Sequence, residues 1–208
     1  MIVIIDYGTG NSGSMLNMFR RIGAQAVIAS DHETLMSASA IVLPGVGAFD
    51  NGMQKLQSAG MLEPLEQRVL RDKIPFLGVC LGMQMLLDCS EEGSLPGLGW
   101  IPGQVKKFDF SGMGKTGLKI PHMGWNTVRS TNSTSLFRGL DEEARFYFVH
   151  TYHVVCRDQT NSLGTSEYGY PFVSAVQKDN IYGVQFHPEK SHRFGMALLK
   201  NFAELSVC

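Results

Sequence analysis

Residues 74–84 read Ile-Pro-Phe-Leu-Gly-Val-Cys-Leu-Gly-Met-Gln, an apolar run that ends in the thiol of Cys80 and continues as a helix-forming stretch. This pattern predicts a buried strand, a tight turn at Cys80 and a helix. Gly78 and Gly82 suit a turn where backbones approach closely. The positive end of a helix dipole stabilises a thiolate, so this is a favourable position for a nucleophile. A lone cysteine, however, is more often a buried core residue.

The first half of the chain alternates apolar strands with helical periodicity. Strands are predicted at 2–5, 25–29, 40–43 and 75–79, with helical segments between them. Short, wholly apolar strands are typical of a sheet that is covered on both faces. The order therefore predicts an α/β fold with a mostly parallel central sheet and helices on both of its faces.

The second half has a different pattern. Residues 93–117 are rich in Gly and Pro and show little periodicity. Strand-like runs follow at 145–155, 172–177 and 181–186, and Asp179-Asn180 predicts a hairpin turn between the last two. A final helix is expected from about 192 to 205. Because no repeat or linker is visible, we expect additional antiparallel strands within one domain that covers residues 1–208.

Composition excludes several functions. The chain has 208 residues, a formal net charge of −1 and a pI of about 6.6, so its composition predicts no nucleic-acid partner. It contains no apolar run long enough for a membrane span, and its first residues lack the basic region of a signal peptide. The four cysteines form no C-x-x-C pair. We therefore expect reduced thiols and a cytoplasmic location.

His187-Pro188-Glu189 follows the strand predicted at 181–186. Residues two apart in extended chain point to the same side, and Pro188 favours extended backbone before it. Glu189 would then orient the imidazole of His187 to accept a proton from a thiol. Alone, this tripeptide is a weak signal, and a surface turn is the more common explanation for it. Sites in parallel sheets form beyond the carboxyl ends of strands, so Cys80 and His187 are expected at one shared edge.

Several motifs together resemble the class I (triad) glutamine amidotransferases, whose fold is flavodoxin-like. They are residues 78–84 (GVCLGMQ), 44–49 (PGVGAF) and 183–189 (GVQFHPE). Residues 121–126 (PHMGWN), 146–152 (FYFVHTY) and 6–11 (DYGTGN) are similar to those of a narrower group, the glutaminase subunits of imidazole glycerol phosphate synthases. The resemblance covers essentially the whole chain, and the motifs come in family order.

The resemblance implies a role for each motif. Cys80 would attack L-glutamine and release ammonia, His187 would shuttle protons and Glu189 would orient it. Further roles would be oxyanion-hole amides from Gly47 and Leu81, substrate binding by Gln84, Thr151 and Tyr152, and partner interface or gate positions at Tyr7, Asn11, Met123, Trp125, Tyr147 and Lys190. No cofactor or metal is implied. The implied partner is a (β/α)₈ cyclase subunit, bound as a heterodimer, which uses the channelled ammonia to make imidazole glycerol phosphate and AICAR in histidine biosynthesis.

Two alternatives remain at this point. Relatives of this subunit supply ammonia for amidine formation on surface-polysaccharide sugars, and Ser12-Gly13-Ser14 departs from the usual pattern near the partner. A dinucleotide-binding protein is more remote: Gly8, Gly10 and Gly13 satisfy G-x-G-x-x-G after a strand, but this leaves Cys80 without a role. His150 and His153 lie three apart on a predicted strand, face opposite sides and cannot share one metal ion.

Overall fold

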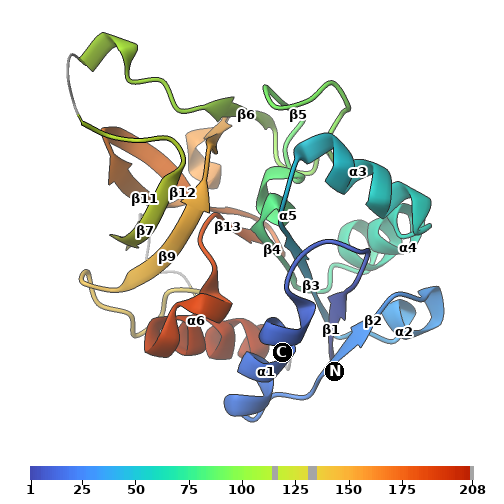
Figure 1. The fold of residues 1–208 in the computed structure, drawn as a ribbon. Coiled ribbons are helices and arrows are strands. Elements are labelled where there is room, and N and C mark those ends of the chain that lie inside the picture. Colours follow the sequence, from blue (N-terminus) through green and yellow to red (C-terminus); the bar gives the residue numbers. More distant parts are fainter. Residues whose placement is uncertain (114–116, 131–134, 207–208) are drawn as a thin grey trace.

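The computed structural model describes residues 1–113, 117–130 and 135–206 (Figure 1). Five parallel strands form one end of its main sheet. In spatial order they are β2 (Ala26–Ala29), β1 (Ile2–Ile5), β3 (Ala40–Gly45), β4 (Phe76–Cys80) and β13 (Ile181–Val184). All of their pairings are parallel, so their carboxyl ends meet at one edge. This confirms the parallel sheet predicted from the apolar strands.

Helices cover both faces of the sheet, as Figure 1 shows. Side chains of β1 alternate between two cores: Ile2 and Ile4 pack in one, Val3 and Ile5 in the other. The first core is completed by α1 (Ser12–Arg21) and α6 (His192–Leu205). The second is completed by α2 (His32–Met36), α3 (Phe49–Ser58) and α4 (Leu62–Glu66), which continues as a π-helical turn at Gln67–Arg71. Burial on both faces explains why these strands are apolar throughout.

Antiparallel strands extend the sheet beyond β13. The predicted hairpin is present: β12 (Tyr170–Lys178) pairs antiparallel with β13, and Asp179 in the turn has a φ of 53°. The sheet then continues through β10 (Tyr152–Cys156) and β6 (Gly103–Lys107), and it ends at β5 (Cys89–Ser90), which pairs parallel with β6. Two further strands, β11 (Ser162–Tyr168) and β8 (Arg129–Ser130), branch from β12.

In the second half of the chain the structure corrects one predicted strand and adds strands that were not predicted. The run at 145–155 is two strands, because β9 (Arg145–His150) leaves the main sheet and pairs with β7 (His122–Thr127), whereas β10 stays in it. The segment 93–117 contains β6, which is held by pairing with the distant β10. Short 3-10 turns lie at Ser111–Met113, Gln159–Asn161 and Pro188–Lys190. No helix in the described ranges has the length and apolarity that a membrane crossing requires.

Candidate active site

Cys80 lies in a strained turn between a strand and a helix. It is the last residue of β4, and α5 (Leu81–Gln84) begins at the next residue. Its φ of 56° is unusual for a residue other than glycine and is typical of strain at functional sites. The turn requires glycines beside it. A Cβ atom on Gly82 would lie 2.0 Å from the carbonyl oxygen of Leu43, and one on Gly78 would lie 2.5 Å from that of Gly82.

His187 and Glu189 form a buried pair. The Nδ1 atom of His187 is 2.8 Å from Oε1 of Glu189, and the two side chains are only 2% and 4% exposed. The backbone of His187 is fixed from the neighbouring strand, since its N–H donates to the carbonyl oxygen of Tyr147 at 2.9 Å. Ser191 adds a hydrogen bond from its hydroxyl to the carbonyl oxygen of His187 at 2.6 Å. The imidazole therefore has one preferred orientation.

The charge state of His187 depends on the thiol. Burial by itself lowers the pKa of His187, but its interactions with Cys80 and Glu189 outweigh this effect and raise the pKa to about 10. Glu189 occupies Nδ1, so Nε2 is the nitrogen that remains for Cys80. Nε2 is buried and makes no hydrogen bond of regular geometry within the described residues. The raised pKa of His187 favours its protonated form, the imidazolium, beside the sulfur of Cys80.

A cavity of about 450 Å³ opens at this edge of the sheet. Of the residues singled out from the sequence, seven line it: Gly47, Cys80, Leu81, Gln84, Thr151, Tyr152 and His187. Glu189 lies behind His187 and is outside the lining. The lining also includes Glu92, which lies outside every motif quoted from the sequence. The remaining lining residues lie within those motifs but were not singled out as site residues: Val46, Ala48, Pro121, Val149 and His150. The cavity thus joins segments that are distant in the sequence, at 46–48, 80–84, 92, 121, 149–152 and 187.

Backbone N–H groups at two places border the cavity. Leu81 is the first residue of α5, where helical N–H groups lack partners within the helix. Gly47 has a φ of 103°, and a Cβ atom there would have no neighbour within 4 Å. The segment around Gly47 is held at both ends, because Gly45 pairs with Cys80 in the sheet and the N–H of Phe49 donates to Glu92 at 2.9 Å. Both positions are suited to donate to a developing oxyanion.

Gln84 connects the cavity wall to a buried amide that the sequence analysis missed. Its Nε2 donates to the carbonyl oxygen of Tyr152 at 3.2 Å and to Oε1 of Gln185 at 3.0 Å. The Nε2 of Gln185 in turn donates to Sγ of Cys80 at 3.6 Å. Gln185 could have been found by the alternation rule that pairs His187 with Glu189, since it lies two residues before His187.

Four of the residues expected at a partner interface lie close together. Met123 and Trp125 are 61% and 47% exposed on β7. The ring of Trp125 meets that of Tyr147 edge-on at 6.0 Å, and Nζ of Lys190 is 5.7 Å from the centre of the Tyr147 ring. Met123 also pairs across the strands with Val149, which lines the cavity. These residues form an exposed cluster at the margin of the cavity.

The other two expected interface residues have different surroundings. Tyr7 is only 5% exposed, and this burial raises its pKa to about 12. Its hydroxyl lies 3.8 Å from the sulfur of Met85. Asn11 is exposed and accepts a hydrogen bond from the N–H of Ser14 at 3.1 Å, which caps α1.

The glycines of the G-x-G-x-x-G pattern have structural explanations. Gly8 and Gly10 have positive φ values of 78° and 94°, and a Cβ atom on Gly10 would lie 3.0 Å from the backbone of Pro44. Nζ of Lys55 donates to the carbonyl oxygen of Gly8 at 2.6 Å. Gly13 is inside α1 rather than in the preceding turn. The turn is therefore closed against β3 and α3, which does not favour dinucleotide binding.

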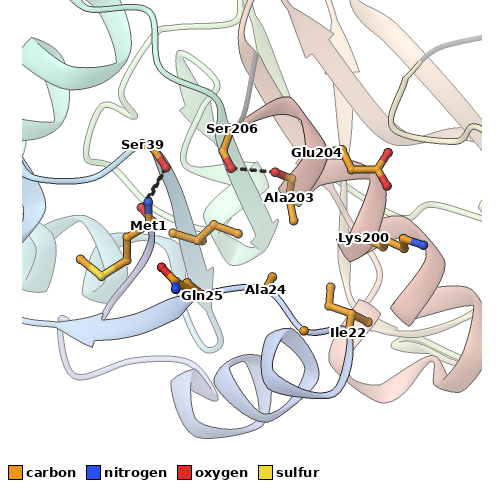
Figure 2. A pocket seen from close by; sticks show the side chains of 11 residues that line it. Met1, Ile22, Ala24, Gln25, Ser39, Lys200, Ala203, Glu204 and Ser206 are labelled. Atoms are coloured by element: carbon orange, nitrogen blue, oxygen red, sulfur yellow. Dashed lines mark hydrogen bonds between the residues drawn. The ribbon is translucent and has the colours of Figure 1, made fainter.

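A second cavity, of about 520 Å³, lies at the opposite edge of the sheet (Figure 2). Its wall includes Ile2, Gln25 and Ser39, which stand at or just before the starts of β1, β2 and β3. Lys200 and Glu204 of α6 complete it. None of the candidate site residues lines this cavity. No cluster of three or more His, Cys, Asp or Glu side chains suited to a metal ion occurs within the described ranges.

Comparison with known proteins identifies the family of this chain. The model of the family "Glutamine amidotransferase class-I" matches residues 3–205. The chain belongs to this family. A protein of Methanococcus maripaludis named imidazole glycerol phosphate synthase subunit HisH 2 is 52% identical over 97% of this chain and 98% of its own length. One of Bdellovibrio bacteriovorus, named imidazole glycerol phosphate synthase subunit HisH, is 51% identical over 99% of this chain and all of its own length.

Solved structures agree on the fold. A crystal structure described as a glutamine amidotransferase has a TM-score of 0.72 and 19% identity, and the match covers all of both chains. A chain in the structure of PurLQS from Thermotoga maritima has a TM-score of 0.72 and 16% identity, with 98% of this chain and 97% of that one covered. The flavodoxin-like class I amidotransferase architecture predicted from the sequence is confirmed.

Proposed function

We propose that this class I glutamine amidotransferase is the glutaminase subunit of an imidazole glycerol phosphate synthase. The observation that carries the proposal is the meeting of Cys80 and His187 at one cavity, with Glu189 paired to His187, in a chain about half identical over its full length to subunits of that name. The residues act as one amidotransferase domain over 1–208. The alternative function, supply of ammonia for amidine formation on surface-polysaccharide sugars, has no support in the names of these relatives.

The first half of the reaction uses the thiolate. Sγ of Cys80 attacks the carboxamide carbon of L-glutamine, and the oxygen that becomes negative is met by N–H groups of Gly47 and Leu81. His187 gives its Nε2 proton to the amide nitrogen, the C–N bond breaks and ammonia leaves. A glutamyl thioester on Cys80 remains. Gln84, Thr151 and Tyr152 line the wall where the amino-acid end of the substrate would bind.

The second half regenerates the enzyme. Neutral His187 takes a proton from water, the hydroxide attacks the thioester carbon, and glutamate leaves as the C–S bond breaks. Glu189 keeps Nδ1 of His187 occupied throughout, so every proton passes through Nε2. No metal or cofactor is part of this sequence. The reaction belongs in the cytoplasm, where a reactive thiol stays reduced.

The ammonia is used by a second subunit. We infer a heterodimer with a (β/α)₈ cyclase that forms imidazole glycerol phosphate and AICAR in histidine biosynthesis. The exposed cluster of Met123, Trp125, Tyr147 and Lys190 at the cavity margin supports a docking face there. Tyr7 and Asn11 remain proposed as further interface or gate positions.

Substitution of the nucleophile tests the proposal. The complex of this chain with its cyclase partner is assayed with glutamine and, separately, with ammonium salt as the nitrogen source. Cys80→Ala removes the only atom that attacks glutamine, so glutamine-dependent synthesis falls to background, whereas ammonia-dependent synthesis persists. Loss of both activities to the same extent, with an intact complex, would refute the division of labour.

A further inference from the structure

Gln185 is the one amide side chain in contact with the sulfur of Cys80 in the described part of the chain. It follows β13, whose Val184 pairs with Val79 of β4, so the sheet register brings it beside Cys80. Its N–H donates to the carbonyl oxygen of Ser174 at 2.9 Å, which fixes its backbone to β12. The residue is fully buried. A buried amide is costly unless it is hydrogen-bonded, so its side-chain partners decide its role.

The surrounding hydrogen bonds fix which end of this amide faces the sulfur. The carbonyl oxygen of Tyr152 can only accept, so Gln84 must point its NH₂ group toward it. The same nitrogen is 3.0 Å from Gln185, which must therefore offer its oxygen to Gln84. The NH₂ group of Gln185 is left to face Sγ of Cys80, 3.6 Å away. The assignment follows from the donors and acceptors present.

Two histidines continue this hydrogen-bond network from the carbonyl oxygen of Tyr152, and their protonation states follow in the same way. The Nδ1 atom of His150 lies 2.7 Å from the carbonyl oxygen of Tyr152, so Nδ1 carries the proton and Nε2 is an acceptor. The Nδ1 of His122 lies 2.9 Å from that acceptor and must donate to it. Asn126 then donates to Nε2 of His122 at 3.3 Å. Each histidine is neutral in this arrangement, and burial lowers the pKa of His150 to about 3 and that of His122 to about 4.

We propose that Gln185 is a catalytic residue whose side-chain N–H stabilises the thiolate of Cys80, and that Gln84 positions it. This inference rests on the proposed function for its role in turnover. Hydrogen bonds to charged acceptors are stronger than those between neutral groups, so the contact favours the thiolate over the thiol. The same contact assists departure of the sulfur when the thioester is hydrolysed. Gln84 thus supports the nucleophile besides lining the substrate wall.

Alkylation of Cys80 by iodoacetamide measures thiolate formation without glutamine or a partner. Peptide mass spectrometry gives the rate at each cysteine separately. Gln185→Leu removes the donor and is expected to slow alkylation of Cys80 at pH 7 by about tenfold or more, the scale of a hydrogen bond to a charged group. Gln177→Leu is the matched control, because Gln177 lies on the same hairpin and donates to Tyr182 rather than to sulfur. Its Cys80 rate stays at the wild-type value.

The other cysteines report on folding in the same experiment. Cys89 is exposed and keeps its rate in all variants, whereas Cys156 is buried and reacts only if the protein opens. An unchanged Cys80 rate in folded Gln185→Leu overturns the proposal. If Cys156 labelling reveals unfolding of that variant, Gln84→Leu is tested instead. This substitution frees the amide of Gln185 to turn away from the sulfur, so the alkylation of Cys80 must slow. An unchanged alkylation rate in Gln84→Leu overturns the proposal. Because no glutamine is used, this result is independent of whether the proposed glutaminase activity is found.

Discussion

His187 and Glu189 are held 2.8 Å apart, from Nδ1 to Oε1, with both side chains almost fully buried. A buried carboxylate needs a charged or hydrogen-bonding partner, and the imidazolium supplies both. The pair therefore keeps Nε2 free for the thiol and stabilises the protonated histidine. This arrangement gives the chain its acid–base group, and its consequences can be measured.

Glu189→Gln tests the electrostatic part of that pair. The amide preserves the shape but removes the negative charge that helps to raise the pKa of His187. We expect glutamine-dependent turnover in the partner complex to fall by about 10²-fold or more, the scale of general acid–base catalysis. Ammonia-dependent synthesis is the control and should persist. A variant with wild-type glutaminase activity would show that Glu189 has no part in the reaction.

The neutral histidine pair makes the fold sensitive to acid. The pKa of His150 is about 3 in the folded protein, against 6.5 for an ordinary histidine. Between about pH 3 and pH 6.5, His150 is protonated in the unfolded chain but neutral in the folded chain. The free energy of unfolding therefore rises with pH in this range, and stability is lost as the pH falls below about 6.5. The loss from this group approaches about 1.4 kcal/mol per pH unit.

Urea unfolding between pH 7 and pH 5 measures that dependence. His150→Gln keeps a hydrogen-bonding side chain that cannot be protonated. In this variant the slope of unfolding free energy against pH should be smaller, by at most the amount that corresponds to the binding of one proton on unfolding. His32→Gln is the matched control, because His32 is exposed on α2, and its slope should equal that of the wild type. Equal slopes in the wild type and His150→Gln would contradict the assigned neutral state.

The turn at Cys80 depends on the absence of a side chain at Gly82. Gly82→Ala places a Cβ atom 2.0 Å from the carbonyl oxygen of Leu43 and should destabilise the protein by about 3 kcal/mol, the upper range for overpacking. Gly13→Ala is the contrasting variant, since Gly13 lies in α1 with no atom within 4 Å of its Cβ position, and it should stabilise by about 0.5–1 kcal/mol. Thermal unfolding of both variants decides. Equal effects would mean that the turn is not tightly packed.

The exposed cluster on β7 is testable as the docking face. Trp125 is 47% exposed and stacks on His192 at 5.4 Å. Trp125→Ala should weaken binding of the cyclase subunit by at least about tenfold, because exposed tryptophans are frequent hot spots. Ile28→Ala is the control, since Ile28 is a 37% exposed apolar residue on β2, an edge strand of the main sheet, whereas Trp125 belongs to the separate sheet of β7 and β9. Calorimetric titration gives both affinities, and an unchanged value for Trp125→Ala would place the interface elsewhere.

Local patterns were sufficient for the elements that depend on local sequence. The helix expected at 192–205 is α6, and the turn at Asp179 joins β12 to β13, because periodicity and turn residues act over a few positions. The split of the run 145–155 was missed, since His150 ends a strand only through pairing with His122 of β7. β6 was missed for the same reason: its partner Val154 is about fifty residues away.

The candidate site likewise has parts that could be predicted from local sequence and parts that depend on distant contacts. Cys80 and His187 were placed at one edge by the rule that parallel strands end together, and the register of β4 and β13 explains why that rule works here. Glu92 could not be found, because it reaches the cavity only through the contact of its loop with the N–H of Phe49. Val149 lies in a quoted motif, but its place at the cavity depends on the second sheet. Gln185 obeys a rule that was already applied to its neighbours and was nevertheless missed.

The most direct measurement of the central claim is a covalent label at the nucleophile. Wild-type protein in complex with its partner is incubated with a glutamine analogue that carries a diazoketone in place of the carboxamide, and the adduct is located by peptide mass spectrometry. We predict one adduct per chain, on Sγ of Cys80, which excess glutamine prevents. An adduct confined to Cys89 or Cys156, or a Cys80 adduct that glutamine does not prevent, would contradict the account.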